Sequence, residues 1–293
     1  MMWIAMAIVS SVCLGFYDIF KKVSLERNNV LVVLFLNTLF GTLLLSPVIV
    51  GDIMDGSIGF SSWHDHLLIM LKSVIVLSSW ALGYVAIKHL PLTITGPITA
   101  TRPVMVLVGA LVVFGERLNG MQWAGIVLGF ASLLFISQLG AREGFSMKSS
   151  RWLWYMIGAT VLGAVSALYD KYLMQHYEPL PVQAWYTLYQ CVMMGVITLV
   201  AVRRGAEMSD RFTWRWSIPL ITLFITVADL AYFFALSLDG SMVSVVSMIR
   251  RGSVLVTFFY GVLILREKNI GLKLLDLAVL LAGLALLIAG SWR

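Results

Sequence analysis

Residues 90–118 read LPLTITGPITATRPVMVLVGALVVFGERL, and this stretch decides the fold. Arg102 is the only charged residue between Lys88 and Glu116, with 13 uncharged residues on each side of it. An apolar segment of this length is long enough to cross the hydrocarbon core of a bilayer as a helix. An arginine near the bilayer centre costs about 2.5 to 3.5 kcal/mol, so Arg102 must face the interior of a helical bundle.

The rest of the chain is similarly apolar. Of its 293 residues, 60% are hydrophobic and 12% are charged, whereas soluble domains contain about 25% charged residues. The mean hydropathy of +0.91 excludes a soluble or disordered chain, and no polar stretch is long enough to form a separate catalytic domain. Ten apolar stretches predict ten transmembrane helices, at 3–20, 30–50, 67–87, 92–114, 121–139, 152–172, 182–202, 217–236, 242–265 and 272–291.

The two halves of the chain resemble each other in sequence. A constant shift of 148 residues pairs identical residues, which are Leu82 with Leu230, Tyr84 with Tyr232, Leu90 with Leu238 and Arg102 with Arg250. Since five spans per half is an odd number, such halves have opposite orientations in the membrane, as in many secondary transporters. We therefore predict an all-α membrane protein of ten transmembrane helices, arranged as two inverted five-helix repeats at 1–140 and 152–293, with a linker at 141–151.

The distribution of Lys and Arg predicts the orientation. Alternate connections place 14 basic residues on one face and four on the other, namely Lys72, Arg117, Lys171 and Arg293. The face richer in Lys and Arg is expected to be cytoplasmic, which puts both termini outside. This rule also accounts for the net charge of +6 without a nucleic-acid partner. We expect the protein in a bacterial inner (plasma) membrane.

Three arginines fall inside predicted spans, namely Arg102, Arg250 and Arg251. Together they cost about 8 to 10 kcal/mol unless they are compensated. Asp229 is the only acid predicted at comparable depth, which leaves a surplus of about two positive charges. An anionic ligand would compensate this surplus, because a guanidinium group binds phosphate or carboxylate through two parallel hydrogen bonds. Structural pairing with buried acids and a water-filled path without anion preference are the alternatives.

Three further residues accompany these arginines. Tyr84 and Tyr232 occupy equivalent positions in the two halves, and they either donate hydroxyl groups to a ligand or belong to interfacial aromatic belts. Asp229 either pairs with an arginine or binds the proton that couples transport. The predicted substrate-binding residues are therefore Arg102, Arg250, Arg251, Tyr84 and Tyr232, with Asp229 in a coupling or ion-pairing role.

The sequence carries no enzyme signature. No His-Glu-Xaa-Xaa-His or Asp-Xaa-Xaa-Asp arrangement lies on any predicted span, no Walker-type loop is present, and Cys13 and Cys191 lie alone in apolar runs. We therefore expect no enzymatic activity, no cofactor and no metal. The expected partners are a small, anionic molecule as substrate and the lipid bilayer, with no nucleic acid, and the chain is expected to act as a monomer or homodimer.

Over its whole length the chain resembles the ten-span EamA-type proteins of the drug/metabolite transporter superfamily. The fourth predicted span begins Leu90-Pro91-Leu92, contains Pro103 and ends Gly115-Glu116-Arg117-Leu118, and the fifth contains Gln122, Gly125 and Gly129. The second half is more divergent, because Arg266-Glu267-Lys268 replaces the Gly-Glu-Arg motif. The resemblance implies a secondary transporter.

The superfamily transports amino acids, other metabolites and phosphorylated compounds, so the resemblance alone does not name a substrate. Its organophosphate exchangers carry a basic residue in the fourth span and a basic pair in the ninth, and Arg102 and Arg250-Arg251 are similar in position. This likeness implies a phosphorylated or otherwise anionic metabolite. An exporter of amino acids or neutral metabolites and a flippase for a phosphate-bearing lipid intermediate remain the alternatives.

Overall fold

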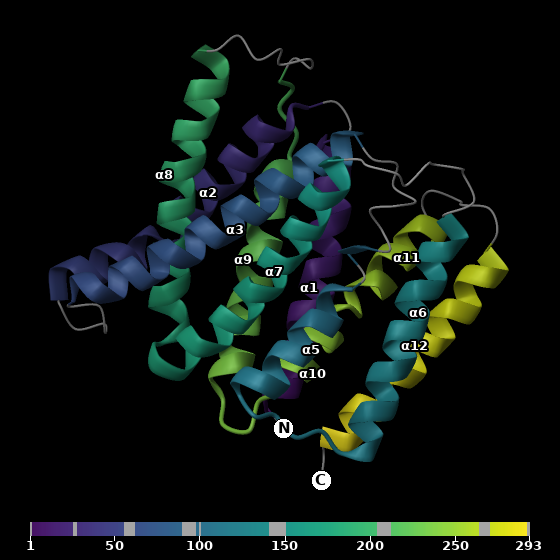
Figure 1. Cartoon of the computed structure of the whole chain (residues 1–293). Helices are drawn as coiled ribbons and strands as arrows, with labels where there is room; N and C mark the ends of the chain where they lie inside the picture. The colour runs from purple at the N-terminus through teal and green to yellow at the C-terminus, as the bar shows by residue number, and fades with distance from the viewer. Residues whose placement is uncertain are drawn as a thin grey trace.

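A computed structural model describes residues 2–25, 28–55, 62–89, 98–99, 101–140, 151–203, 212–263 and 270–291 (Figure 1). These residues contain helices and no strand. In chain order the helices are α1 (Met2–Leu25), α2 (Val30–Asp55), α3 (Trp63–His89), α5 (Arg102–Val113), α6 (Gly120–Gly140), α7 (Arg151–His176), α8 (Pro179–Arg203), α9 (Ser217–Ser237), α10 (Val243–Arg250), α11 (Ser253–Leu263) and α12 (Ile270–Ser291).

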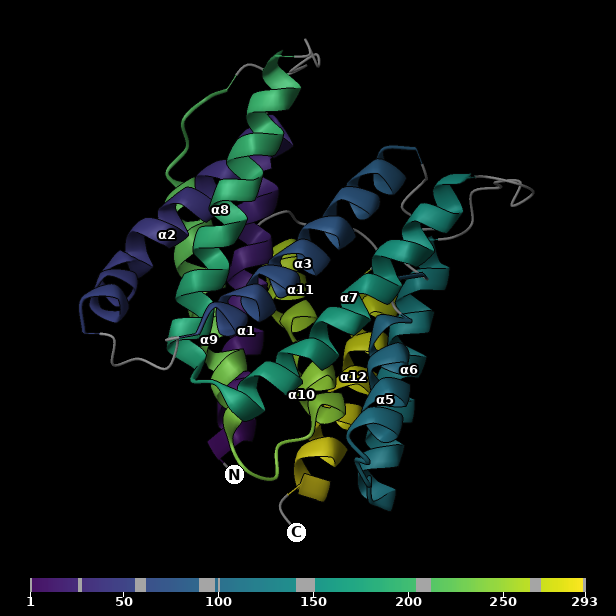
Figure 2. The ribbon, with the colours of Figure 1, turned by 60° about the vertical axis from the view of Figure 1, so that its left-hand side comes forward.

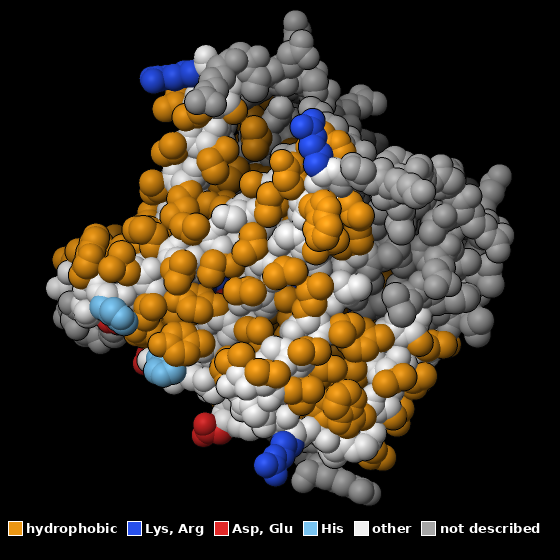
Figure 3. Space-filling model, in the orientation of Figure 1, with side chains coloured by type: hydrophobic (Ala, Val, Ile, Leu, Met, Phe, Trp, Pro, Cys, Tyr) orange, Lys and Arg blue, Asp and Glu red, His pale blue; other side chains and the backbone are white. Residues whose placement is uncertain are grey.

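Six of the described helices are long and apolar enough to cross a membrane, namely α1, α2, α3, α7, α8 and α9. Helix α5 and residues 278–291 of α12 are shorter apolar segments. Hydrophobic side chains cover the middle of the face shown in Figure 3, while most visible charged side chains lie toward its edges. The prediction of an all-helical chain is thus confirmed over the described residues, and the count of ten spans stays a prediction.

Helices from the two halves pair with one another. Helix α1 packs on α9, α2 on α8, α3 on α7, and α6 on α12 (Figures 1 and 2). The α6 and α12 backbones meet at two glycines: a Cβ on Gly125 would lie 2.6 Å from the carbonyl oxygen of Gly283. A Cβ on Gly283 would lie 2.9 Å from the carbonyl oxygen of Gly125. Small residues allow this close approach, which replaces the hydrophobic driving force that helices lack in lipid.

The segment predicted as one span at 242–265 is broken in its middle. Helix α10 ends at Arg250, a turn contains Arg251 and Gly252, and α11 begins at Ser253. A Cβ on Gly252 would lie 2.9 Å from Ser11 Oγ of α1, so the close approach of α1 favours glycine at the break. The prediction of a continuous helix was therefore wrong at this point, and the break places two arginines at a helix end.

The main buried cluster lies toward the end of the bundle that holds both termini (Figure 1). It joins Ile4 near the start of α1, Ile69 near the start of α3, Leu173 near the end of α7 and Val245 near the start of α10. The other three buried clusters are much smaller.

Candidate substrate site

Arg250 and Asp229 form an ion pair inside the bundle. One terminal nitrogen of Arg250 donates to Asp229 Oδ1 at 2.8 Å, and the guanidinium group lies over the Tyr232 ring, 4.1 Å from its centroid. Asp229 and Tyr232 are three residues apart on α9, so they share one helix face. The structure therefore brings three of the predicted site residues into direct contact, and Asp229 takes the ion-pairing position.

Arg251 and Arg102 complete a cluster of like charges. Arg251 follows Arg250 in the turn after α10, and α10 packs against α5, whose first residue is Arg102. The Nε atoms of all three arginines are buried and have no hydrogen-bond partner within the described part of the chain. A buried donor without a partner costs about 1 to 3 kcal/mol, and more when the group is charged. The cluster is therefore short of acceptors.

Arg102 is the first residue of α5, and its guanidinium group packs against Gly163 of α7. A Cβ on Gly163 would lie 2.5 Å from Arg102 Cζ, so a larger residue at position 163 would require the Arg102 side chain to shift. Helix α5 covers the second half of the span predicted at 92–114; residues 92–97 and 100 lie outside the described residues. The Tyr84 side chain also lies outside what the structure describes, so its binding role stays a prediction.

Lys72 of α3 and Asp170 of α7 form a second buried ion pair, which was not predicted from the sequence. Lys72 is 3% exposed and its Nζ lies 4.4 Å from the centroid of the Tyr186 ring. Counting Lys72 and Lys171 among the connecting loops was wrong, because both lie inside helices and are buried. Lys72 already fell within the predicted span at 67–87, so the position of its charge could have indicated the pair.

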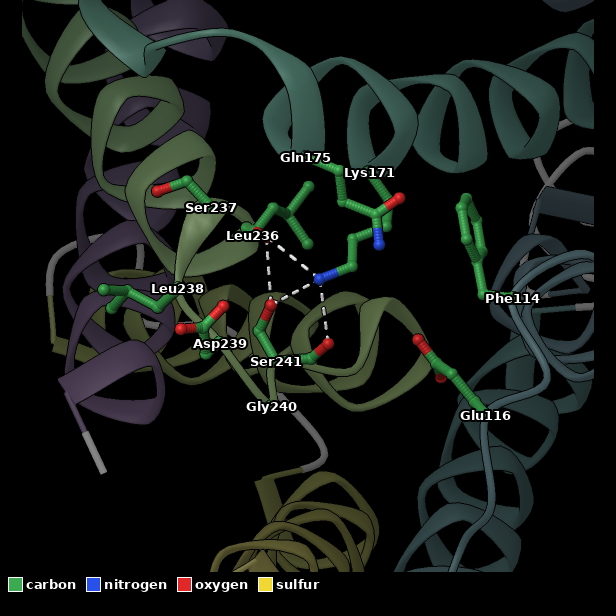
Figure 4. A pocket seen from close by; sticks show the side chains of 10 residues that line it. All are labelled: Phe114, Glu116, Lys171, Gln175, Leu236, Ser237, Leu238, Asp239, Gly240 and Ser241. Atoms are coloured by element: carbon green, nitrogen blue, oxygen red, sulfur yellow. Dashed lines mark hydrogen bonds between the residues drawn. The ribbon is translucent and has the colours of Figure 1, made fainter.

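A polar pocket of about 250 Å³ lies at the end of the bundle that holds the termini (Figure 4). On one side Lys171 Nζ donates to the carbonyl oxygens of Leu236 at 3.0 Å and Ser241 at 2.9 Å, as the dashed lines in Figure 4 show. These bonds hold the connection between α9 and α10 against α7.

On the other side of this pocket, Glu116 caps the N-terminus of α10. Its carboxylate accepts hydrogen bonds from the backbone nitrogens of Val243 at 2.5 Å and Ser244 at 3.3 Å, and from the Ser244 hydroxyl group. A carboxylate is favourable at a helix N-terminus because the first N–H groups lack partners within the helix. Gly115, with φ +60°, provides the left-handed turn that precedes this acid. Glu116 of the Gly-Glu-Arg-Leu motif thus joins the two halves.

A smaller cavity of about 60 Å³ lies between α1, α2, α3, α8 and α9, and Asp229 lines it. Its other lining is rich in amide and hydroxyl groups, including those of Asn37, Thr38, Gln183, Thr187, Gln190 and Thr226. Because Asp229 also binds Arg250, this polar cavity is connected to the arginine cluster through one side chain.

The first half of the chain matches a known family. Residues 1–138 fit the model of the EamA-like transporter family. This part of the chain is therefore similar to the EamA-like transporter family. This match confirms, over these residues, the resemblance drawn from the sequence, and the six apolar helices that are long enough to cross a membrane support an integral membrane protein.

The fold extends over the second half as well. A solved structure titled "Crystal structure of protein" matches 97% of this EamA-like chain and 98% of its own, with a TM-score of 0.72 and 15% sequence identity. At this identity the likeness concerns the fold alone. No curated protein matches the sequence.

Proposed function

We propose that this EamA-like transporter moves a small anionic metabolite, phosphorylated or carboxylated, across the membrane by alternating access. In this proposal Arg102, Arg250 and Arg251 bind the acidic group, and Tyr232 helps to hold Arg250 in place. The observation that carries the proposal is the presence of three buried arginine Nε donors without a hydrogen-bond partner in the described chain.

The balance of charge around the cluster supports an anionic ligand. Asp229 is the acid in direct contact with the arginines, at 2.8 Å from Arg250. Asp18 of α1 forms an ion pair with Lys21 at 3.9 Å. Because Lys72 and Asp170 neutralise each other, neither of them offsets the cluster. Because Asp18 pairs with Lys21, the predicted surplus of about two positive charges is left within the described part of the chain, and an anion would neutralise it.

The direct test is exchange in liposomes that contain the purified protein. Vesicles are loaded with one member of a panel of sugar phosphates, nucleotide sugars, carboxylates, amino acids and lipid headgroup phosphates. We expect uptake of a labelled anion only when the lumen contains an anion of the same class. Exchange restricted to amino acids would overturn the proposal, and activity restricted to lipid-linked phosphates would indicate a flippase.

We also propose that the two halves, 1–140 and 152–293, are inverted repeats joined by a linker at 141–151. The pairing of helices supports this, because exchanging the halves converts the α1–α9 contact into the α7–α3 contact. The α2–α8 and α6–α12 contacts are converted into themselves. A two-fold relation between inverted halves has this property.

The proposed inverted repeat and the excess of Lys and Arg on one face support a further proposal, that both termini lie outside a bacterial inner membrane. A C-terminal reporter that is active only in the cytoplasm should therefore remain silent, while a periplasmic reporter at the same position should be active. Strong cytoplasmic activity would contradict this orientation. Figure 1 shows both termini at the same end of the bundle, as an even number of spans requires.

A further inference from the structure

Gln183, which lines the cavity beside Asp229, has a carbonyl oxygen that no group in the described part of the chain satisfies. Gln183 of α8 is 3% exposed, and its Nε2 donates to the carbonyl oxygen of Thr226 on α9 at 2.9 Å. Because a carbonyl oxygen only accepts hydrogen bonds, this contact fixes the orientation of the amide. The Gln183 Oε1 atom is then buried without a hydrogen-bond partner in the described part of the chain.

The place of this acceptor points to a ligand group. Gln183 and Asp229 line the same cavity, and Asp229 binds Arg250 of the proposed anion site. The cavity volume of about 60 Å³ admits a small polar group, since roughly 10 to 15 Å³ is enough for one water molecule. An amide acceptor beside such a space recognises a hydrogen-bond donor.

We infer that Gln183 Oε1 accepts a hydrogen bond from a hydroxyl or amino group of the transported molecule, so that the substrate is an anion that also carries a hydrogen-bond donor. This inference rests on the proposed function. Sites that bury a polar group discriminate against analogues that leave it without a partner. Gln183 therefore selects hydroxylated or aminated anions over plain anions of the same charge and size.

The chain offers a matched control in Gln122 of α6, which is 2% exposed. Its Oε1 accepts from the backbone nitrogen of Asn119 at 2.9 Å, and its Nε2 donates to Ser291 Oγ at 3.0 Å. Both ends of this amide are satisfied by protein groups, and it does not line the cavity beside Asp229. Gln122→Met thus removes a buried amide without removing the proposed ligand contact.

The test measures binding of two matched anion pairs and one neutral compound to the purified protein. The pairs are glycerol 3-phosphate with propyl phosphate and glycerate with butyrate, and the neutral compound is glycerol. We expect the wild type to bind the hydroxylated member of one pair about tenfold more tightly. Gln183→Met should abolish this preference and change the affinity for the plain anion less than twofold, while Gln122→Met should retain the preference.

The outcomes separate the inference from the proposed function. Equal binding of both members of each pair by the wild type overturns the inference and leaves anion transport standing. An equal loss of both members in Gln183→Met indicates a structural role and also overturns the inference. Glycerol binding that depends on Gln183, without binding of any anion, supports the donor contact and overturns the anionic substrate. Absence of binding by all five compounds overturns both.

Discussion

Replacing Lys72 with methionine should lower the free energy of unfolding by about 3 to 5 kcal/mol, because it leaves the Asp170 carboxylate buried without its partner. Asp170 of α7 is 7% exposed, and its carboxylate binds Lys72 Nζ directly. The loss of Lys72 also removes the contacts of its charge with the rings of Tyr186 and Phe233, at 4.4 and 4.8 Å from the ring centroids. Chemical unfolding in mixed micelles measures the change.

A double variant separates a lost ion pair from a general packing defect. Lys72→Met combined with Asp170→Leu removes both charges, so we expect it to recover most of the stability lost in Lys72→Met alone. Arg203→Met is the control, since Arg203 is exposed at the end of α8 and its replacement should change stability by less than about 0.5 kcal/mol. A Lys72→Met protein as stable as the wild type would contradict this account of the pair.

The largest expected effect on transport comes from Arg102. Arg102→Gln should reduce anion transport by about a hundredfold or more with little loss of stability, because its buried Nε has no partner in the described part of the chain and removing the charge relieves its desolvation cost. Arg102→Lys keeps the positive charge but loses the planar guanidinium group that can donate two parallel hydrogen bonds, so we expect anion transport to fall by about tenfold to a hundredfold. Melting temperature and exchange rate are measured on the same purified variants.

Replacing Arg250 should affect stability more than replacing Arg102, because Arg250 pairs with Asp229 of the protein. Arg250→Gln leaves Asp229 without the guanidinium at 2.8 Å, so this variant should lose stability as well as transport. Adding Asp229→Asn should restore the stability and not the transport. If Arg102→Gln unfolds as readily as Arg250→Gln, the arginines have a structural role and the anion site is wrong.

Sequence patterns predicted the helices well because each span is apolar over its own length. They also placed Arg102, Arg250 and Arg251 in the membrane, since isolated charges stand out in such a segment. The contacts between helices could not be predicted from the sequence. Lys72 and Asp170 are 98 residues apart, and no local pattern around either residue identifies the other as its partner. The break after Arg250 depends on the approach of α1 at Gly252, which is again a tertiary contact.

The cavity beside Asp229 could not be predicted from the sequence either. Gln183 and Thr226 are unremarkable polar residues at the start and middle of their helices. Only their contact at 2.9 Å fixes the amide and leaves one acceptor without a partner. Glu116 was identified as part of a motif, but its role as a cap of α10 requires the position of the second half of the chain.

Equilibrium binding of a labelled sugar phosphate to the purified wild type and to Arg102→Gln tests the anion site most directly. Both proteins are measured at the same temperature and salt concentration, since charge interactions weaken as ionic strength rises. We predict saturable binding by the wild type, competition by inorganic phosphate, and affinity at least a hundredfold weaker in Arg102→Gln. Equal binding by the two proteins, or competition by neutral amino acids and not by phosphate, would contradict the account.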